Sequence, residues 1–149
     1  MKKIAFSFLG VLFLLACSKD KFKTVPQVEI KSLQPTEVFN DGTFSFQATV
    51  RDKEGDLQDT VWLVSKRFDE NNVVLTADTL PFSLVNFGFP DKTQIELEAN
   101  FSYGEDRPGY IFQNLETNDR NFALGIIVKD KAGNKSEYAE SEKIILKKF

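Results

Sequence analysis

The segment Thr43–Val50 has the sequence TFSFQATV, and its strict alternation decides the fold class. Alternate positions carry two phenylalanines, an alanine and a valine, while the positions between them carry serine, glutamine and threonine. Successive side chains of a strand point to opposite faces. The segment is therefore predicted to be a strand with one buried and one solvated face.

The same alternation continues elsewhere in the chain. Residues 93–103 (TQIELEANFSY) place their apolar side chains at every second position over a longer span. Residues 122–128 (FALGIIV) are apolar on both faces, which is typical of a central strand. Weaker strands are predicted over residues 28–33, 73–76, 82–87 and 144–146.

Residues 60–68 (TVWLVSKRF) also form a predicted strand, but both of its faces carry apolar side chains. We expect one of these two faces to be buried. The residues on that face are Trp62, Val64 and Phe68. Val61 and Leu63 are expected to face the other side.

Turn-forming residues separate the predicted strands. Asn, Asp and Gly supply the backbone conformations that tight connections require. They occur at residues 40–42, 54–56, 70–72 and 132–134. About seven short strands joined in this way predict an all-β chain, folded as an antiparallel β-sandwich. The longest predicted connection, residues 104–120, exceeds the usual loop length.

The N-terminus has the features of an export signal. Two lysines, Lys2 and Lys3, precede an apolar run over residues 4–16, which is shorter than the roughly 20 residues of a spanning helix. The tetrapeptide LLAC, which ends at Cys17, resembles the lipobox of bacterial lipoproteins, in which the cysteine is acylated after cleavage. An ordinary secretory signal is the alternative. We expect a signal peptide at 1–16, a lipidated polar tether at 17–26 and a folded domain at 27–149.

The residues after Cys17 bear on its destination. Ser18, rather than aspartate, follows the cysteine, which resembles an outer-membrane lipoprotein. The charged residues that come next resemble the surface-export signals of Bacteroidetes lipoproteins, although those are usually more acidic. We therefore expect a lipid-anchored outer-membrane protein with its membrane contact through acylated Cys17. Whether it faces the surface or the periplasm stays open.

The composition restricts the possible activities. Removal of residues 1–16 leaves 17 basic and 22 acidic side chains, a formal charge of −5 that argues against a nucleic-acid partner. The chain has no histidine, and acylation of Cys17, its one cysteine, would remove the thiol. The usual nucleophile–base pairs are then lacking, and no hydrolase elbow or phosphate-binding loop occurs. We expect a protein that is not an enzyme.

Three segments carry a family resemblance: GTFSFQATV (42–50), RDKEGD (51–56) and VKDKAGNKSE (128–137). With the strand order around them, they resemble the immunoglobulin-like domains, related to fibronectin type III, PKD and cadherin-like modules, of Bacteroidetes lipoproteins. The resemblance covers nearly all of residues 27–149. It implies an immunoglobulin-like β-sandwich, with Trp62 as the core tryptophan.

In such sandwiches the connections that contain RDKEGD and KDKAGN lie at the same end. Their oxygen-bearing side chains would then lie close enough for a Ca²⁺ ion, which takes six to eight oxygen ligands. The candidate metal ligands are Asp52, Glu54, Asp56, Asp130 and Asn134. The alternative is that these residues only form tight turns, since Lys53, Lys131 and Lys135 would repel a cation. No other cofactor is expected.

Aromatic side chains outside the alternating core faces suggest a carbohydrate site, because sugars stack on aromatic rings. The principal candidates are Phe87, Phe89, Tyr110 and Phe112, with Phe39 and Tyr103 as further ones. The alternative is that these rings close the ends of the core, since most of the 15 phenylalanines must be buried.

The function expected from the sequence is a lipid-anchored interaction or adhesion module of the cell envelope, without catalytic activity. Its partner would be an envelope protein or a glycan. The alternative is a glycan-binding accessory lipoprotein of a polysaccharide-uptake system. A third possibility is a periplasm-facing structural partner of an outer-membrane complex. The fold class alone does not distinguish these roles.

Overall fold

The computed structural model describes residues 25–57, 59–83, 92–104, 111–112 and 118–148, with only the backbone described at 111–112. This part of the chain contains ten strands and no helix, and hence no helix long and apolar enough to cross a membrane. The strands are β1 (Gln27–Gln34), β2 (Glu37–Val38), β3 (Thr43–Arg51), β4 (Thr60–Phe68), β5 (Val74–Ser83), β6 (Gln94–Tyr103), β7 (Ile111–Phe112), β8 (Arg120–Lys129), β9 (Ala139–Glu140) and β10 (Ile144–Leu146).

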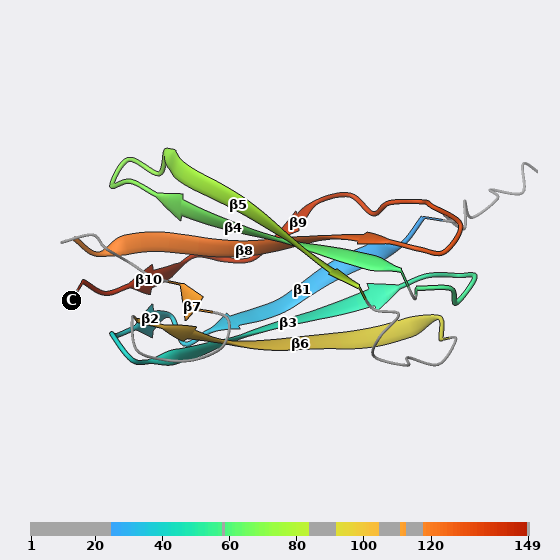
Figure 1. Ribbon diagram of the computed structural model, residues 1–149, viewed down its shortest axis with the longest axis horizontal. Coiled ribbons are helices and arrows are strands. Elements are labelled where there is room, and N and C mark those ends of the chain that lie inside the picture. The colour runs from blue at the N-terminus through green and yellow to red at the C-terminus, as the bar shows by residue number, and fades with distance from the viewer. Residues whose placement is uncertain (1–24, 58, 84–91, 105–110, 113–117, 149) are drawn as a thin grey trace, which may run out of the picture.

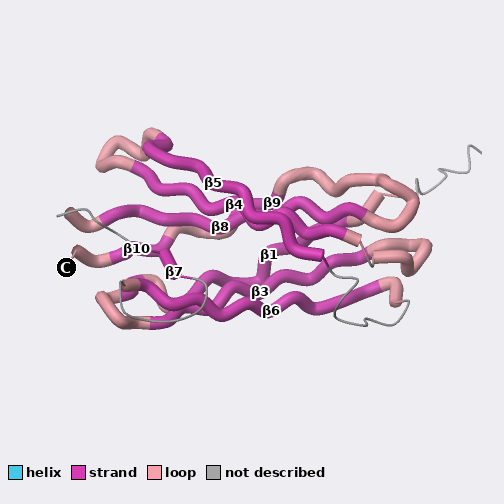
Figure 2. The backbone as a smooth tube through the Cα atoms, in the orientation of Figure 1, coloured by secondary structure: helices cyan, strands magenta, loops and turns pink. Residues whose placement is uncertain are grey.

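The strands form two sheets that pack face to face (Figure 1). One sheet has the order β1-β3-β6-β7, and the other has the order β2-β10-β8-β4-β5, with β9 also paired to β8. The two layers run along the length of the molecule in Figure 2. The pairs β2–β10 and β6–β7 are parallel, whereas the other pairs are antiparallel. The predicted all-β, immunoglobulin-like sandwich is confirmed.

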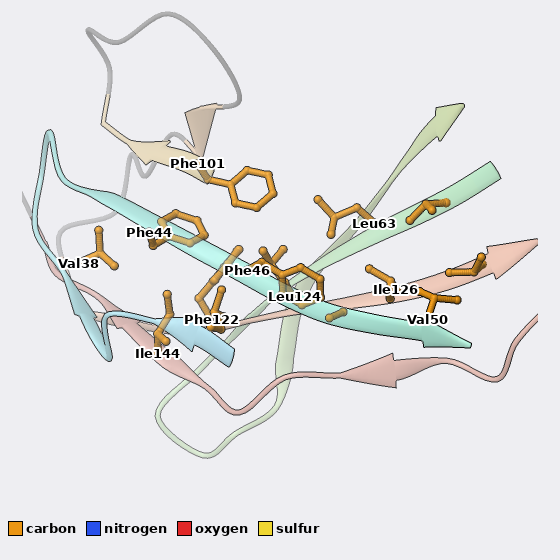
Figure 3. Close-up of a cluster of buried hydrophobic side chains, with 14 of the residues drawn as sticks. Val38, Phe44, Phe46, Val50, Leu63, Phe101, Phe122, Leu124, Ile126 and Ile144 are labelled. Atoms are coloured by element: carbon orange, nitrogen blue, oxygen red, sulfur yellow. The ribbon is translucent and has the colours of Figure 1, made fainter. Parts of the chain in front are cut away.

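The core lies between the two sheets, and β3 supplies its centre as its alternation predicted. Phe44 and Phe46 are each 2% exposed, and Ala48 and Val50 are fully buried. Figure 3 shows Phe44, Phe46 and Val50 of β3 together with Phe122, Leu124 and Ile126 of β8 in the opposite sheet. The ring of Phe44 stacks on Phe101 at 5.3 Å and meets the edge of Phe122 at 5.7 Å. These aromatic contacts join both sheets into one core.

The predicted orientation of β4 is wrong. Val61 and Leu63 are buried in the core, and Trp62 and Val64 lie on the outer face of the sheet, each partly exposed. Cross-strand pairing fixes this orientation, because Leu63 pairs with the core residue Ile126. Trp62 is therefore not the core tryptophan that the family resemblance implied.

The outer face of β4 is partly covered. The segment between β8 and β10 runs beside β8, and its lysines reach over the aromatic rings of β4. The ammonium of Lys135 lies 4.8 Å from the ring centroid of Trp62, and that of Lys143 lies 3.7 Å from that of Phe68. Phe68 is only 5% exposed although it lies outside the main core. Cation–π contacts thus stabilise apolar rings on a face that would otherwise meet water.

Strand β5 is longer than predicted, since it joins the predicted strand 73–76 to the start of the predicted strand 82–87. It is the last strand of its sheet and pairs only with β4 among the described strands. Every residue from Val74 to Pro81 is exposed. Within the long predicted connection 104–120, the backbone of β7 adds a short parallel strand beside β6.

Candidate metal centre

Two connections meet at one end of the sandwich, at the right of Figure 1. One follows β3 and contains Asp52 and Asp56, and the other follows β8 and begins with Asp130. The backbone N–H of Lys131 donates a hydrogen bond of 3.0 Å to the carbonyl oxygen of Asp56, which fixes one connection against the other. The prediction that these two turns share one end of the fold is confirmed.

Asp52 organises the first turn. Its side chain is buried, with the residue 3% exposed. Its Oδ2 accepts backbone N–H hydrogen bonds from Glu54, Gly55 and Asp56, at 3.2, 3.0 and 3.4 Å. Gly55 permits the turn because it adopts a φ of +75°, in the left-handed region that L side chains rarely occupy. The other oxygen, Oδ1, is buried and has no hydrogen-bond partner.

Asp130 organises the second turn and is fully buried. Its Oδ1 accepts a hydrogen bond of 2.7 Å from the backbone N–H of Asn134, and its Oδ2 accepts one of 2.8 Å from the Asn134 side-chain amide. The backbone N–H of Asp130 in turn donates to the carbonyl of Asn134 at 3.0 Å. These contacts hold the carboxylate of Asp130 in a single orientation.

The carboxylates of Asp52, Asp56 and Asp130 come together at this end. One oxygen from each residue lies within 4.8 Å of the others. Oδ1 of Asp56 is also buried and without a hydrogen-bond partner. Burial raises the pKa of Asp56, and the nearby carboxylates of Asp52 and Asp130 raise it further. The cluster is therefore electrostatically strained unless a proton or a cation lies among the three groups.

Of the five metal ligands predicted, the structure brings three together. Glu54 is exposed and lies outside the cluster, and Asn134 donates to Asp130, so its role is to position that carboxylate. Two lysines at this end contact groups outside the cluster of three aspartates. Lys129 forms an ion pair of 2.6 Å with Asp59, and Lys135 lies over Trp62.

The predicted carbohydrate residues are not brought together in the described part of the chain. Phe87, Phe89 and Tyr110 lie outside the described residues, as does Cys17, and only the backbone of Phe112 is described. Of the two further aromatics, Phe39 is 62% exposed. Tyr103 is fully buried, and its hydroxyl donates to the carbonyl of Lys147 at 2.7 Å. Tyr103 therefore closes the core.

Sequence reasoning missed the exposed edge formed by β5. Large apolar side chains are exposed at Val73 (59%), Val74 (46%), Leu75 (46%) and Leu80 (43%). The signal that could have found it was the low charge of this stretch, since Val73–Ser83 contains one acidic residue and no basic residue. Soluble proteins usually place charged side chains, lysine above all, on such an edge.

No protein-family model and no curated protein matches this chain. Similar solved structures include the sporulation control protein Spo0M of Bacillus subtilis, with 10% identity and a TM-score of 0.46 over 84% of this chain and 50% of that chain. The C-terminal domain of Wzt matches with 12% identity and a TM-score of 0.39 over 80% of this chain and 72% of that one.

The CARDB domain of a Pyrococcus furiosus protein, in complex with di-metal ions, matches with 9% identity and a TM-score of 0.27 over 79% of this chain and 84% of that domain. This chain spans only half of the Spo0M chain. All three TM-scores lie below 0.5. The assignment to the immunoglobulin-like sandwiches therefore rests on the strand order and pairing of the chain itself.

Proposed function

We propose that this protein is a lipid-anchored, non-catalytic interaction module of a bacterial outer membrane, and that it binds an extended segment of a protein partner along β5. The first part of the proposal is the lipid anchor at Cys17. The signal-like N-terminus and the LLAC tetrapeptide support acylation at Cys17. Stable anchoring requires more than one acyl chain, as a processed lipoprotein cysteine would carry.

The second part of the proposal, the binding of a protein partner, rests on the exposed edge of β5. Of the six large apolar side chains that are exposed in the described residues, four lie on β5 or directly before it: Val73, Val74, Leu75 and Leu80. The strand is ten residues long, and no described strand pairs with its outer edge. An edge of this kind accepts a further strand through main-chain hydrogen bonds, with side chains that fix the specificity. A glycan lacks the repeating amides for such pairing, so a polypeptide fits the edge better.

Two residues of β5 limit nonspecific pairing of its edge with other strands. Pro81 lacks a backbone N–H, and Asp78 brings the one charge of the strand. The stretch from Val74 to Ala77 contains neither a proline nor a charge, and it is the part of the edge proposed to accept the partner.

The experiment places a photo-crosslinking amino acid at Leu75 in the full-length protein, expressed in its envelope. A matched variant carries the same group at Glu98, an exposed position of β6. We expect discrete crosslinked adducts to envelope protein from Leu75 and none from Glu98. The variant Leu75→Lys should weaken the partner contact, whereas Gln47→Lys, which adds the same charge to the outer face of β3, should leave it intact.

The anchor is tested separately by mass spectrometry of the mature N-terminus and by detergent phase partition of Cys17→Ser. An unmodified N-terminus in the wild type would refute the anchor. Equal crosslinking from both positions, adducts only to a second copy of this chain, or none from Leu75 would each refute the edge. Protection of the Leu75 site by soluble polysaccharide would instead favour the glycan-binding alternative.

A further inference from the structure

We propose that Asp52, Asp56 and Asp130 form a Ca²⁺ site that joins the connection after β3 to the connection after β8. This inference goes beyond the proposed interaction function and does not depend on it. It rests on the geometry of three carboxylates at one end of the sandwich.

The cluster contains two buried carboxylate oxygens that have no hydrogen-bond partner. Asp52 is 3% exposed, and the turn amides use its Oδ2 but not its Oδ1. Oδ1 of Asp56 is likewise buried and unpaired. A buried carboxylate oxygen without a hydrogen bond or a counter-charge is strongly destabilising. Two such oxygens beside the fully buried Asp130 indicate that a positively charged ligand completes the arrangement.

The spacing and the chemistry of the three carboxylates suit a calcium ion. Calcium–oxygen distances are about 2.3–2.6 Å, so two oxygens on opposite sides of the ion lie about 5 Å apart. The observed limit of 4.8 Å between the carboxylate oxygens fits within that coordination sphere. The donors are all oxygens, and the chain has no histidine and a single cysteine far away in the sequence, at Cys17. A donor set of this kind selects a hard cation over zinc or copper.

Hydrogen bonds within the two turns already hold the three aspartates in place. Three backbone amides fix Asp52, and two groups of Asn134 fix Asp130. Asp56 is fixed through its carbonyl, which accepts the N–H of Lys131. The turn role of these aspartates and the ion-binding role are therefore compatible, because the turn contacts leave coordinating oxygens unused. Water molecules and backbone carbonyls would complete the coordination.

The site would stabilise the end of the sandwich at which the described chain enters. Figure 1 shows the start of β1 at the same end as the two acidic connections. A bound ion would join two connections that are distant in sequence but adjacent in space.

The test uses the full-length protein, purified in detergent and stripped of metal with EDTA. Calorimetric titration with CaCl₂ is expected to show one site, and Ca²⁺ at a hundred times its Kd should raise the Tm by roughly 10 °C. EDTA should reverse the rise, and Mg²⁺ should give a smaller one. Tb³⁺ emission sensitised by the aromatic residues is a second readout, and excess Ca²⁺ should displace it.

Three variants separate coordination from general charge. Asp130→Asn and Asp56→Asn should each lose the Ca²⁺-dependent rise in Tm. Asp59→Asn is the matched control, since it removes one negative charge at the same end from a residue paired with Lys129, and it should keep the rise. Asp56→Asn is also expected to raise the Tm without calcium, because it relieves repulsion, and so it stays folded.

An absence of Ca²⁺ binding and of Tb³⁺ emission in the wild type would overturn the proposal and favour a shared proton in the cluster. A loss of the response in Asp59→Asn equal to that in Asp130→Asn would also overturn it, since nonspecific charge would then explain the effect.

Discussion

Gly125 of β8 leaves room for the ring of Tyr138 on the outer face of the second sheet. A β-carbon at this position would lie 2.5 Å from Cζ of Tyr138, well inside van der Waals contact. The ring of Tyr138 thus lies directly against the backbone of β8. Lys66 approaches the same ring, at 4.4 Å from its centroid, and the Tyr138 hydroxyl donates to Glu140. Because Gly125 has no side chain, Tyr138 can lie against β8 and contact both Lys66 and Glu140.

We therefore expect Gly125→Ala to lower the free energy of unfolding by about 1 kcal/mol, because the added methyl group displaces the tyrosine ring. In the background of Tyr138→Ala the same change should cost almost nothing. Denaturant unfolding of the four proteins in a double-mutant cycle measures the difference. Additive costs would show that the ring contact does not restrict residue 125.

The contribution of Glu140 to the free energy of unfolding should depend on pH. Burial alone would raise its pKa, but the hydrogen bonds that Lys66 and Tyr138 donate outweigh burial, so its pKa lies below the ordinary 4.5. A carboxylate whose pKa is lowered by folding stabilises the folded state above pH 4.5, and the contribution disappears as the pH falls through the folded-state pKa. We expect Glu140→Gln to be less stable than the wild type by about 0.5–1 kcal/mol at pH 7.

The gap between the two proteins should narrow as the pH falls below about 4.5, because the wild type then loses the same charge. Thermal unfolding at a series of pH values from 7 to 3 provides the measurement. A gap that is constant over this range would show that Glu140 contributes through packing rather than through its charge.

At the level of single residues, the sequence predicted where the acidic cluster lies, but not which of the five candidate residues form it. Asp52 and Asp130 were predicted as oxygen-bearing residues of two connections at one end of the fold, and each aspartate accepts amides of its own turn. Glu54 is also acidic and close in sequence, but it is exposed and lies outside the cluster. Only the meeting of two distant connections shows which oxygens remain unused, and no local pattern contains that information.

At the level of elements, β3 and β4 show when alternation suffices. One face of β3 is polar, so a shift of one residue would bury polar side chains, and its orientation was predicted correctly. In β4, Val61 and Leu63 compete with Trp62 and Val64, and either face is apolar enough for a core. Pairing with β8 sets the orientation, and Lys135 and Lys143, from a segment about 70 residues away, lie over the aromatic rings that this orientation leaves on the outer face.

The orientation of β3 gives a matched pair of variants. Phe46→Ala removes a ring that is 2% exposed, and it should cost about 3–5 kcal/mol in the free energy of unfolding. Gln47→Ala changes the adjacent, exposed side chain and should stay within about 0.5 kcal/mol of the wild type. Urea unfolding followed by circular dichroism measures both. Similar costs for the two variants would contradict the buried and solvated faces assigned to this strand.

At the level of the whole molecule, the two sheets depend on one core. Phe44 of the first sheet touches Phe122 of the second, and the buried residues of both sheets form a single cluster. Among the described residues the buried hydrophobic side chains form this one cluster, and the rings of Trp62 and Phe68, outside it, are contacted by Lys135 and Lys143. The two sheets are therefore expected to unfold together.

Amide hydrogen exchange tests this dependence sheet by sheet. The slowest amides of β3 and β6 should have the same opening free energy as those of β4 and β8, because each opens only when the shared core is lost. Phe46→Ala, which changes the first sheet, should lower the opening free energy of β8 amides by the same amount as that of β6 amides. If β8 kept its protection while β6 lost it, the outer cover of the second sheet would be a second source of stability, and the sandwich would contain two cooperative units.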